Sequence, residues 1–221
     1  MYARVADVMT RDVVAVRADA SFKEIAAMLR SMQVSAFPVL DGDDKVIGVV
    51  SETDLLPKEA LEAGFERHRG WRSARRHRAE LAKAAGVTAA DLMSRPPVTV
   101  GPFDLVSHAA HLMYDHGITR LPVVGPGGKL AGIISRSDVL SVFNRPDEDI
   151  RREITQDVIM DGFFTDPARL TVTVQDGIVT LAGEPGGVVL GRGIADQVRH
   201  VEGVVAVRDR FRYPQVGPAG S

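Results

Sequence analysis

The chain repeats itself, and this internal repeat limits the folds open to it more than any other feature. When the sequence is shifted by 84 positions, residues 6–56 align with residues 90–140 without a gap, and 14 of the 51 aligned pairs are identical. The identical pairs include Met9/Met93, Gly48/Gly132 and Asp54/Asp138. A gapless match of this length predicts two copies of one supersecondary unit. A unit of about 50 residues buries little apolar surface alone, so we expect the two copies to pack against each other.

Each copy has the pattern of a mixed helical and stranded unit. A short β-rich run comes first, at 13–16 and again at 97–100. In the first copy Phe22, Ile25 and Leu29 then share one face at helical spacing, which predicts a helix. An apolar hairpin with a Gly-rich or Asp-rich turn follows, and a last helix is expected to begin near Asp54 and Asp138. The order β-α-β-β-α predicts an α+β protein.

The turn between the last strand and the last helix is the candidate site of each copy. It reads GVVSETD at 48–54 and GIISRSD at 132–138. A carboxylate at this point can accept hydrogen bonds from both hydroxyls of a ribose, and the N–H groups of a helix N-terminus suit a phosphate. The alternative is that these Ser and Asp side chains serve only as helix N-caps. Because the whole pattern occurs twice, we favour the binding interpretation.

These motifs resemble those of cystathionine-β-synthase-type (CBS) domains arranged in tandem. The resemblance rests on DVMT at 7–10, VSAFPV at 34–39 and GVVSETD at 48–54, with their equivalents in the second copy, and it covers about residues 1–144. It implies a pseudo-twofold module that binds an adenine nucleotide (AMP, ADP or ATP) as a regulatory ligand, with no other cofactor. It also implies a flat homodimer and a non-catalytic sensor that relays occupancy to the rest of the chain or to an unknown protein partner.

The resemblance further implies two clefts, each of which combines the Asp of one copy with base-contacting residues of the other. The favoured cleft would consist of Thr10, Val14, Val34, Ser35, Ala36, Arg120, Ser135, Ser137 and Asp138. The second cleft would consist of Ser51, Thr53, Asp54, Ser94, Val98, Ile118 and Thr119. We favour the Asp138 cleft because Arg120 offers a fork of donors to a phosphate, whereas its aligned residue is Ala36. The alternative for Arg120 is a solvated surface side chain.

The stretch between the copies, residues 58–88, interrupts the symmetry. It is rich in arginine and contains the single tryptophan, Trp71. Good helix formers at 79–85 precede Gly86, which predicts a helix that stops there. Three interpretations stay open: a solvated helical cover, a patch for nucleic acid or an acidic partner, and extra contacts to the phosphate of a nucleotide. The lack of a spaced set of stacking aromatic residues and the net charge of −2 argue against nucleic acid.

The chain after Asn144 follows a different pattern. We place the copies at residues 1–57 and 89–145, a C-terminal domain at 146–213 and a disordered tail at 214–221. The domain has an expected α-β-β-α-β order, with Asp176-Gly177 as a hairpin turn. VTVQDGIVTLAG at 172–183 and VEGVVAV at 201–207 resemble a BON domain, which implies phospholipid or envelope interaction. The alternative is a packing or protein-interaction domain.

Several other function classes find little support. The chain has no cysteine, which excludes disulfides and thiolate metal sites. His108 and His111 share a predicted helical face, but no third metal ligand follows at suitable spacing. We find no P-loop and no pairing of a nucleophile with a base, so we expect no enzyme activity. With neither a signal peptide nor a long apolar segment visible, we expect a cytoplasmic protein.

Two alternatives to a nucleotide sensor remain. One is an interaction or dimerisation scaffold whose clefts are vestigial. The other is a protein that associates with a phospholipid membrane through its BON domain.

Overall fold

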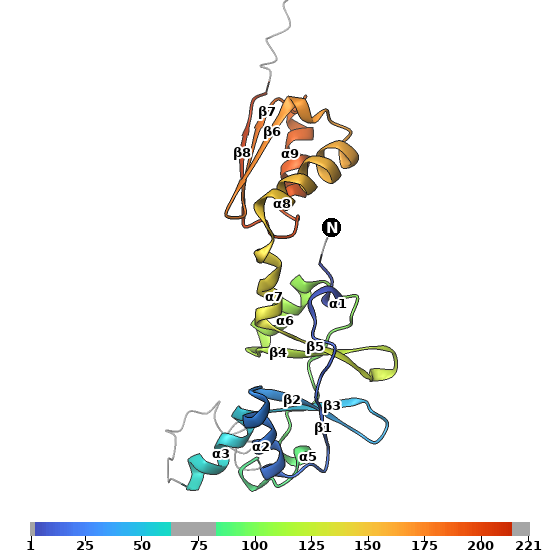
Figure 1. Ribbon diagram of the computed structural model, residues 1–221, viewed down its shortest axis with the longest axis vertical. Coiled ribbons are helices and arrows are strands. Elements are labelled where there is room, and N and C mark those ends of the chain that lie inside the picture. Colours follow the sequence, from blue (N-terminus) through green and yellow to red (C-terminus); the bar gives the residue numbers. More distant parts are fainter. Residues whose placement is uncertain (1–2, 63–82, 214–221) are drawn as a thin grey trace, which may run out of the picture. The chain divides into compact units, whose positions relative to one another are not determined.

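A computed structural model describes residues 3–62 and 83–213 (Figure 1). The chain divides into one compact unit, Arg4–Arg136, and a second unit that begins at Ser137. Both mix helices with strands, which confirms the predicted α+β class. The arginine-rich residues 63–82, including Trp71, and the tail from 214 onwards lie outside the described residues, so the expectations for them stay predictions.

The first repeat contains the hairpin and helices expected from its sequence. Its elements are α1 (Val5–Val8), β1 (Val16–Arg17), α2 (Phe22–Met32), β2 (Ala36–Leu40), β3 (Val46–Ser51) and α3 (Glu52–Glu62). Helix α2 begins at the N-cap Ser21, whose Oγ accepts the N–H of Glu24 at 3.3 Å. Strand β2 lies between β1, which is parallel to it, and β3, which is antiparallel.

The second repeat has the same order with one weaker strand. After a helical turn at 83–85 come α5 (Ala89–Leu92), α6 (Val106–His116), β4 (Arg120–Val124), the 3-10 turn η1 (Pro126–Gly128) and β5 (Leu130–Ser135). The strand expected at 97–100 is reduced to one parallel bridge between Val100 and Val123. Pro96 and Pro97 precede this bridge and have no N–H to donate to a neighbouring strand.

The two repeats are related by a pseudo-twofold arrangement. Thr10 bridges Ile133 and Ser94 bridges Val49, and these two pairs are equivalent under the shift of 84 positions. The bridge between Lys45 and Lys129 joins two residues that are each other's equivalents. The first residues of each repeat thus pair with the other repeat, which confirms the predicted packing of the copies.

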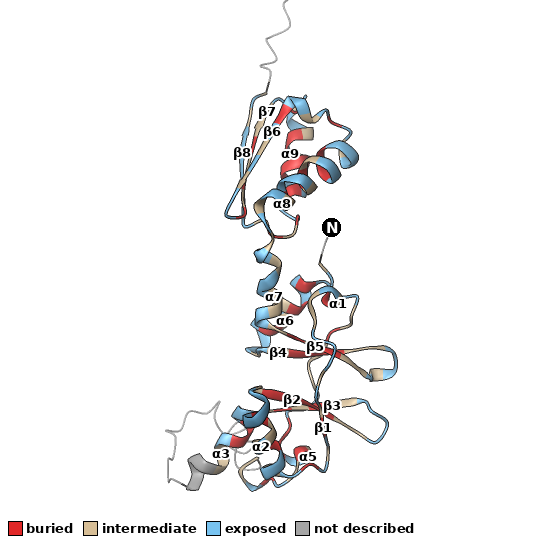
Figure 2. Cartoon of the chain, viewed as in Figure 1, coloured by how far each residue is buried: buried red, intermediate tan, exposed pale blue. Residues whose placement is uncertain are grey.

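Apolar side chains between the sheets and helices form the core of this unit. In the first repeat Ile25, Phe37 and Val39 are almost fully buried, and Leu92 of α5 joins the same cluster. In the second repeat Met113 and several residues of β4 and β5 are buried in the same way. Figure 2 shows this buried surface along β2 and β4. The core therefore fixes the strand ends from which the candidate site residues emerge.

The second unit has the expected α-β-β-α-β order. Its elements are α7 (Arg136–Ser141), η2 (Val142–Asn144), α8 (Asp147–Glu153), the π-helix η3 (Ile154–Gly162), η4 (Pro167–Arg169), β6 (Leu170–Gln175), β7 (Ile178–Gly183), α9 (Val188–Val198) and β8 (Ala206–Phe211). Strand β7 is antiparallel to β6 and parallel to β8, and α8 and α9 cover one face of this sheet (Figure 1). The core between the helices and the sheet contains Ile154, Leu181 and Ile194.

The predicted hairpin turn of the second unit is present at Asp176-Gly177. Both residues have positive φ, 51° and 71°, which the two-residue turn requires. The Asp147 carboxylate accepts both of their N–H groups, at 2.7 and 2.8 Å, and so fastens the turn to the start of α8. Among the described residues, no helix is long and apolar enough to cross a membrane.

Candidate functional site

Asp54 stands at the point where β3 becomes α3. Strand β3 ends at Ser51, and Asp54 is the third residue of α3. The backbone N–H and the hydroxyl of Ser51 both donate to Asp54 Oδ2, at 2.8 and 2.7 Å. A third-position carboxylate that accepts the N–H of the preceding N-cap residue is one half of a capping box. The N-cap interpretation therefore describes one oxygen of this carboxylate.

The other oxygen of Asp54 faces two further donors. Lys83 Nζ forms an ion pair with Asp54 Oδ1, and Ser94 Oγ donates to the same oxygen at 3.3 Å. Lys83 Nζ also donates to Ser94 Oγ at 3.0 Å. Asp54 is only 8% exposed, and a buried carboxylate requires partners of this kind. The three side chains come from three separate segments of the chain.

The structure brings Ser51, Asp54 and Ser94 of the second predicted cleft together. Ser94 comes from the other repeat, where its backbone exchanges hydrogen bonds of 2.8 and 3.2 Å with Val49. We call Ser51, Asp54, Lys83 and Ser94 the Asp54 cluster. It does not include the remaining four residues assigned to this cleft. Thr53 and Thr119 are exposed, whereas Val98 and Ile118 are half-buried. The Thr119 carbonyl accepts the N–H of Arg136 at 3.1 Å.

Sequence reasoning missed Lys83. The sequence places it in the predicted helical stretch between the repeats, where its helix propensity is the only signal. One lysine among many basic residues carries no mark of a contact with Asp54, which lies 29 positions earlier. The contact depends on how the chain around Lys83 and Gly86 folds back towards Asp54. A local sequence pattern does not encode this path.

Three residues of the favoured cleft lie at one edge of the second repeat. Arg120 begins β4 directly opposite Ser135, the last residue of β5. Thr10 exchanges backbone hydrogen bonds of 3.0 and 2.9 Å with Ile133 on the same strand. Ser137 and Asp138 follow in α7, as part of the second unit.

The remaining residues of the favoured cleft belong to the first repeat. Val14 is 37% exposed, Val34 and Ser35 are half-buried, and Ala36 is buried opposite Ser51. The Ser35 carbonyl accepts the N–H of Glu52 at 3.0 Å, as the Thr119 carbonyl does for Arg136 in the other repeat. The first residues of α3 and α7 thus make equivalent backbone hydrogen bonds, whereas the side chains near them differ.

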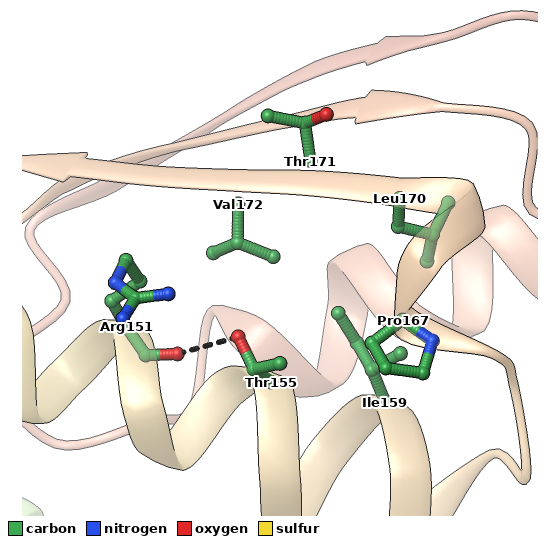
Figure 3. A pocket seen from close by; sticks show the side chains of 7 residues that line it. All are labelled: Arg151, Thr155, Ile159, Pro167, Leu170, Thr171 and Val172. Atoms are coloured by element: carbon green, nitrogen blue, oxygen red, sulfur yellow. Dashed lines mark hydrogen bonds between the residues drawn. The ribbon is translucent and has the colours of Figure 1, made fainter.

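A cavity of about 270 Å³ lies within the second unit (Figure 3). The residues that line it come from α8, η3, η4 and β6 and are Arg151, Thr155, Ile159, Pro167, Leu170, Thr171 and Val172. Glu148 holds the Arg151 guanidinium with two contacts, at 2.8 and 2.6 Å, and this hydrogen bonding lowers the pKa of Glu148. The volume is slightly below the ~300–1,000 Å³ typical of small-molecule sites.

The histidines of α6 do not assemble a metal site. His111 Nε2 lies 3.2 Å from the carboxylate of Asp115, one turn further along the helix. Within residues 3–62 and 83–213, no three His, Asp or Glu side chains are grouped as metal ligands would be.

Comparison with known proteins gives matches over both units. The family model for the CBS domain matches residues 5–61 and 89–145, and the model for the BON domain matches residues 146–215. An uncharacterized protein of Methanopyrus kandleri is 33% identical over 138 residues, which are 62% of this chain and 61% of that protein. The chloroplastic CBS domain-containing protein CBSX1 of Arabidopsis thaliana is 30% identical, with 62% of each chain covered. The chain thus spans about three fifths of the length of these relatives.

A solved structure shows the same likeness in three dimensions. The sequence of CBSX2, in its crystal structure in complex with AMP, is 29% identical to that of this chain. The two structures superpose with a TM-score of 0.55. The match covers 62% of this chain and 94% of that one. The chain therefore belongs to the CBS domain family, as a tandem CBS pair followed by a C-terminal BON domain.

Proposed function

We propose that this protein is a regulatory sensor that binds an adenine nucleotide in the clefts of its CBS pair. The observation that carries the proposal is the divided role of the Asp54 carboxylate. Oδ2 is fixed to Ser51, whereas Oδ1 accepts donors from Lys83 and Ser94, which belong to other segments. A ribose hydroxyl is a donor of the same kind and can take the place of one of them. The AMP bound to CBSX2, a relative at 29% identity, supports the choice of ligand.

We further propose that the favoured cleft forms around Asp138 and binds phosphate more tightly than the Asp54 cleft. Arg120 supports this, because it lies opposite Ser135 and its guanidinium can engage a phosphate with two parallel hydrogen bonds. Asp138 lies in α7, the first element of the second unit. A nucleotide held by Asp138 would act on the element from which the BON domain continues, and this provides a route by which occupancy is relayed.

The proposed role is binding without turnover, in a homodimer. The Asp54 cluster holds a carboxylate, an ammonium group and two hydroxyls, and both hydroxyls donate to the carboxylate, which also forms the ion pair with Lys83. We assign this carboxylate to the binding of a ribose rather than to proton transfer. Large apolar side chains are exposed on helices of the CBS pair, among them Leu56 (62%) and Tyr114 (86%). Surface of this kind is compatible with a subunit interface.

Isothermal titration calorimetry of the full chain with AMP, ADP and ATP tests this function. We expect Asp54→Asn and Asp138→Asn each to remove the binding of one nucleotide. The reason is that an amide nitrogen cannot accept a hydrogen bond from a ribose hydroxyl. Arg120→Ala should weaken the Asp138 cleft by about tenfold or more, since hydrogen bonds to charged groups are worth about 1.5–3 kcal/mol. The control is Asp43→Asn, which alters an exposed carboxylate of the first hairpin turn.

Wild-type affinity in all three cleft variants would contradict the site assignment. A folded protein that binds none of the three nucleotides would favour the scaffold with vestigial clefts. Conversion of ATP during incubation would show an enzyme in place of a sensor.

A further inference from the structure

We propose that Lys83 makes the Asp54 cleft selective for phosphorylated nucleosides over uncharged ones. In the structure Lys83 holds the oxygen of Asp54 that a ribose hydroxyl would take, and we infer that its ammonium group moves to the phosphate when a nucleotide binds. This inference rests on the proposed function of the same cleft and adds the rule by which the cleft chooses its ligand.

The backbone that presents Lys83 is well anchored. The N–H of Gly86 donates to the Lys83 carbonyl at 3.0 Å and ends the helical turn. A Cβ at Gly86 would lie 3.0–3.1 Å from side chains of α5, so this turn packs closely against α5. The Val87 carbonyl then accepts the N–H of Phe22 at 2.9 Å, which ties the segment to the first repeat. Lys83 therefore reaches the cleft from a fixed base, with only its side chain free to change partner.

The ion pair between Lys83 and Asp54 is largely buried, so each charge is stabilised mainly by the other. The side chain of Lys83 is 20% exposed and that of Asp54 is 10% exposed. Removing one member of a shielded ion pair leaves the other charge uncompensated, which is strongly unfavourable. Ser94 contacts both groups but is neutral and cannot replace either charge.

The chemistry of the ligand decides whether the exchange is favourable. A ribose hydroxyl that donates to Asp54 Oδ1 displaces Lys83 but brings no negative charge. With adenosine, the displaced ammonium group would lose its anionic partner. With AMP, the phosphate supplies that partner, and the flexible lysine stem with its three rotatable donors can follow it. The cleft should therefore discriminate by ligand charge.

The test compares AMP with adenosine by calorimetry in the full chain carrying Asp138→Asn, so that the Asp54 cleft is measured alone. We expect AMP to bind at least about tenfold more tightly than adenosine, as the loss of one charge-assisted hydrogen bond implies. Lys83→Met should weaken AMP by about tenfold and strengthen adenosine, because the competitor for Oδ1 has gone. Lys23→Met changes an exposed lysine of α2 and should leave both affinities as they were.

Lys83→Arg distinguishes loss of charge from loss of fold. The arginine variant keeps the positive charge and should keep a preference for AMP, whereas the methionine variant should lose it. If Lys83→Met changes AMP and adenosine by the same factor, or changes neither, the inference is wrong although the cleft still binds. If the Asp138→Asn chain binds neither ligand, the proposed function of the Asp54 cleft fails, and the inference fails with it.

Discussion

At the scale of single residues, the two repeats interlock through reciprocal contacts between methionine and glycine. Met9 of the first copy packs on Gly132 of the second, and Met93 of the second packs on Gly48 of the first. Both pairs were already visible as identities in the aligned repeat. Their recurrence has a steric cause, since neither glycine has room for a Cβ. The same contacts hold Thr10 and Ser94 beside β5 and β3, the strands that lead to the proposed clefts.

The two glycines should not be equally sensitive to substitution. A Cβ at Gly132 would lie 2.8 Å from the Thr10 carbonyl oxygen, a backbone atom that cannot move aside alone. At Gly48 the three nearest atoms all belong to the flexible side chain of Met93. We expect Gly132→Ala to lower the free energy of unfolding by about 1–3 kcal/mol, and Gly48→Ala to lower it by less. Urea denaturation measures both.

Gly42→Ala is the matched control, because a Cβ at Gly42 meets nothing within 4 Å. Its free energy of unfolding should stay within about 0.5 kcal/mol of wild type. Equal losses in Gly132→Ala and Gly48→Ala would contradict the distinction between a backbone and a side-chain obstacle.

The residues of the site were predictable to different degrees. The repeat alone marked Ser51 and Asp54, because both recur in a pattern of fixed spacing. Ser94 followed from the resemblance, which assigns each cleft residues of both copies. Lys83 was not predictable, since its contact with Asp54 depends on a non-local path of the chain. The sequence also left open that Asp54 would use its two oxygens differently.

At the scale of elements, the one-turn helices at the start of each repeat fasten one copy to the other. The periodicity of the sequence did not indicate α1 or α5, because four residues are too few to show a helical pattern. The strand predicted at 97–100 is a different case, because its β-rich residues form only the single bridge of Val100 to Val123. The longer α2 and the hairpins were predictable because their patterns extend over many residues. Helix α5 matters most for the site, since Ser94 lies just beyond its end.

A hydrogen-bonded carboxylate at the start of α5, that of Asp91, should make the free energy of unfolding depend on pH in the acid range. The Thr88 hydroxyl donates to Asp91 at 2.8 Å and, with the N–H groups of Val87 and Thr88, lowers the pKa of Asp91 below its usual 3.8. A lowered pKa in the folded state stabilises the fold above the unfolded pKa, and this contribution disappears as pH falls through the folded value. Asp91→Asn should therefore lower the melting temperature by a few degrees at neutral pH.

The difference between Asp91→Asn and wild type should shrink as the pH falls below about 3.8. Thermal melts from neutral to acid pH measure it, with Asp43→Asn as an exposed comparison. A difference that is constant across the pH range would show that the ionised carboxylate does not stabilise α5.

At the scale of the whole molecule, we propose that the position of Asp138 in α7 connects nucleotide binding to the BON domain. Hydrogen–deuterium exchange of the full chain should show that AMP changes the exchange of residues 137–213, because α7 is the first element of that unit. The change should be lost in Asp138→Asn and kept in Asp54→Asn. Exchange that changes only within residues 4–136 would show that occupancy is not relayed.

The most direct measurement of the central claim is a crystal structure of the chain with AMP. We predict a ribose hydroxyl at Asp54 Oδ1, Ser51 still bound to Oδ2, and the Lys83 ammonium group moved from Asp54 to the phosphate. AMP bound with its ribose away from both Asp54 and Asp138, or no AMP in either cleft at saturating concentration, would contradict it.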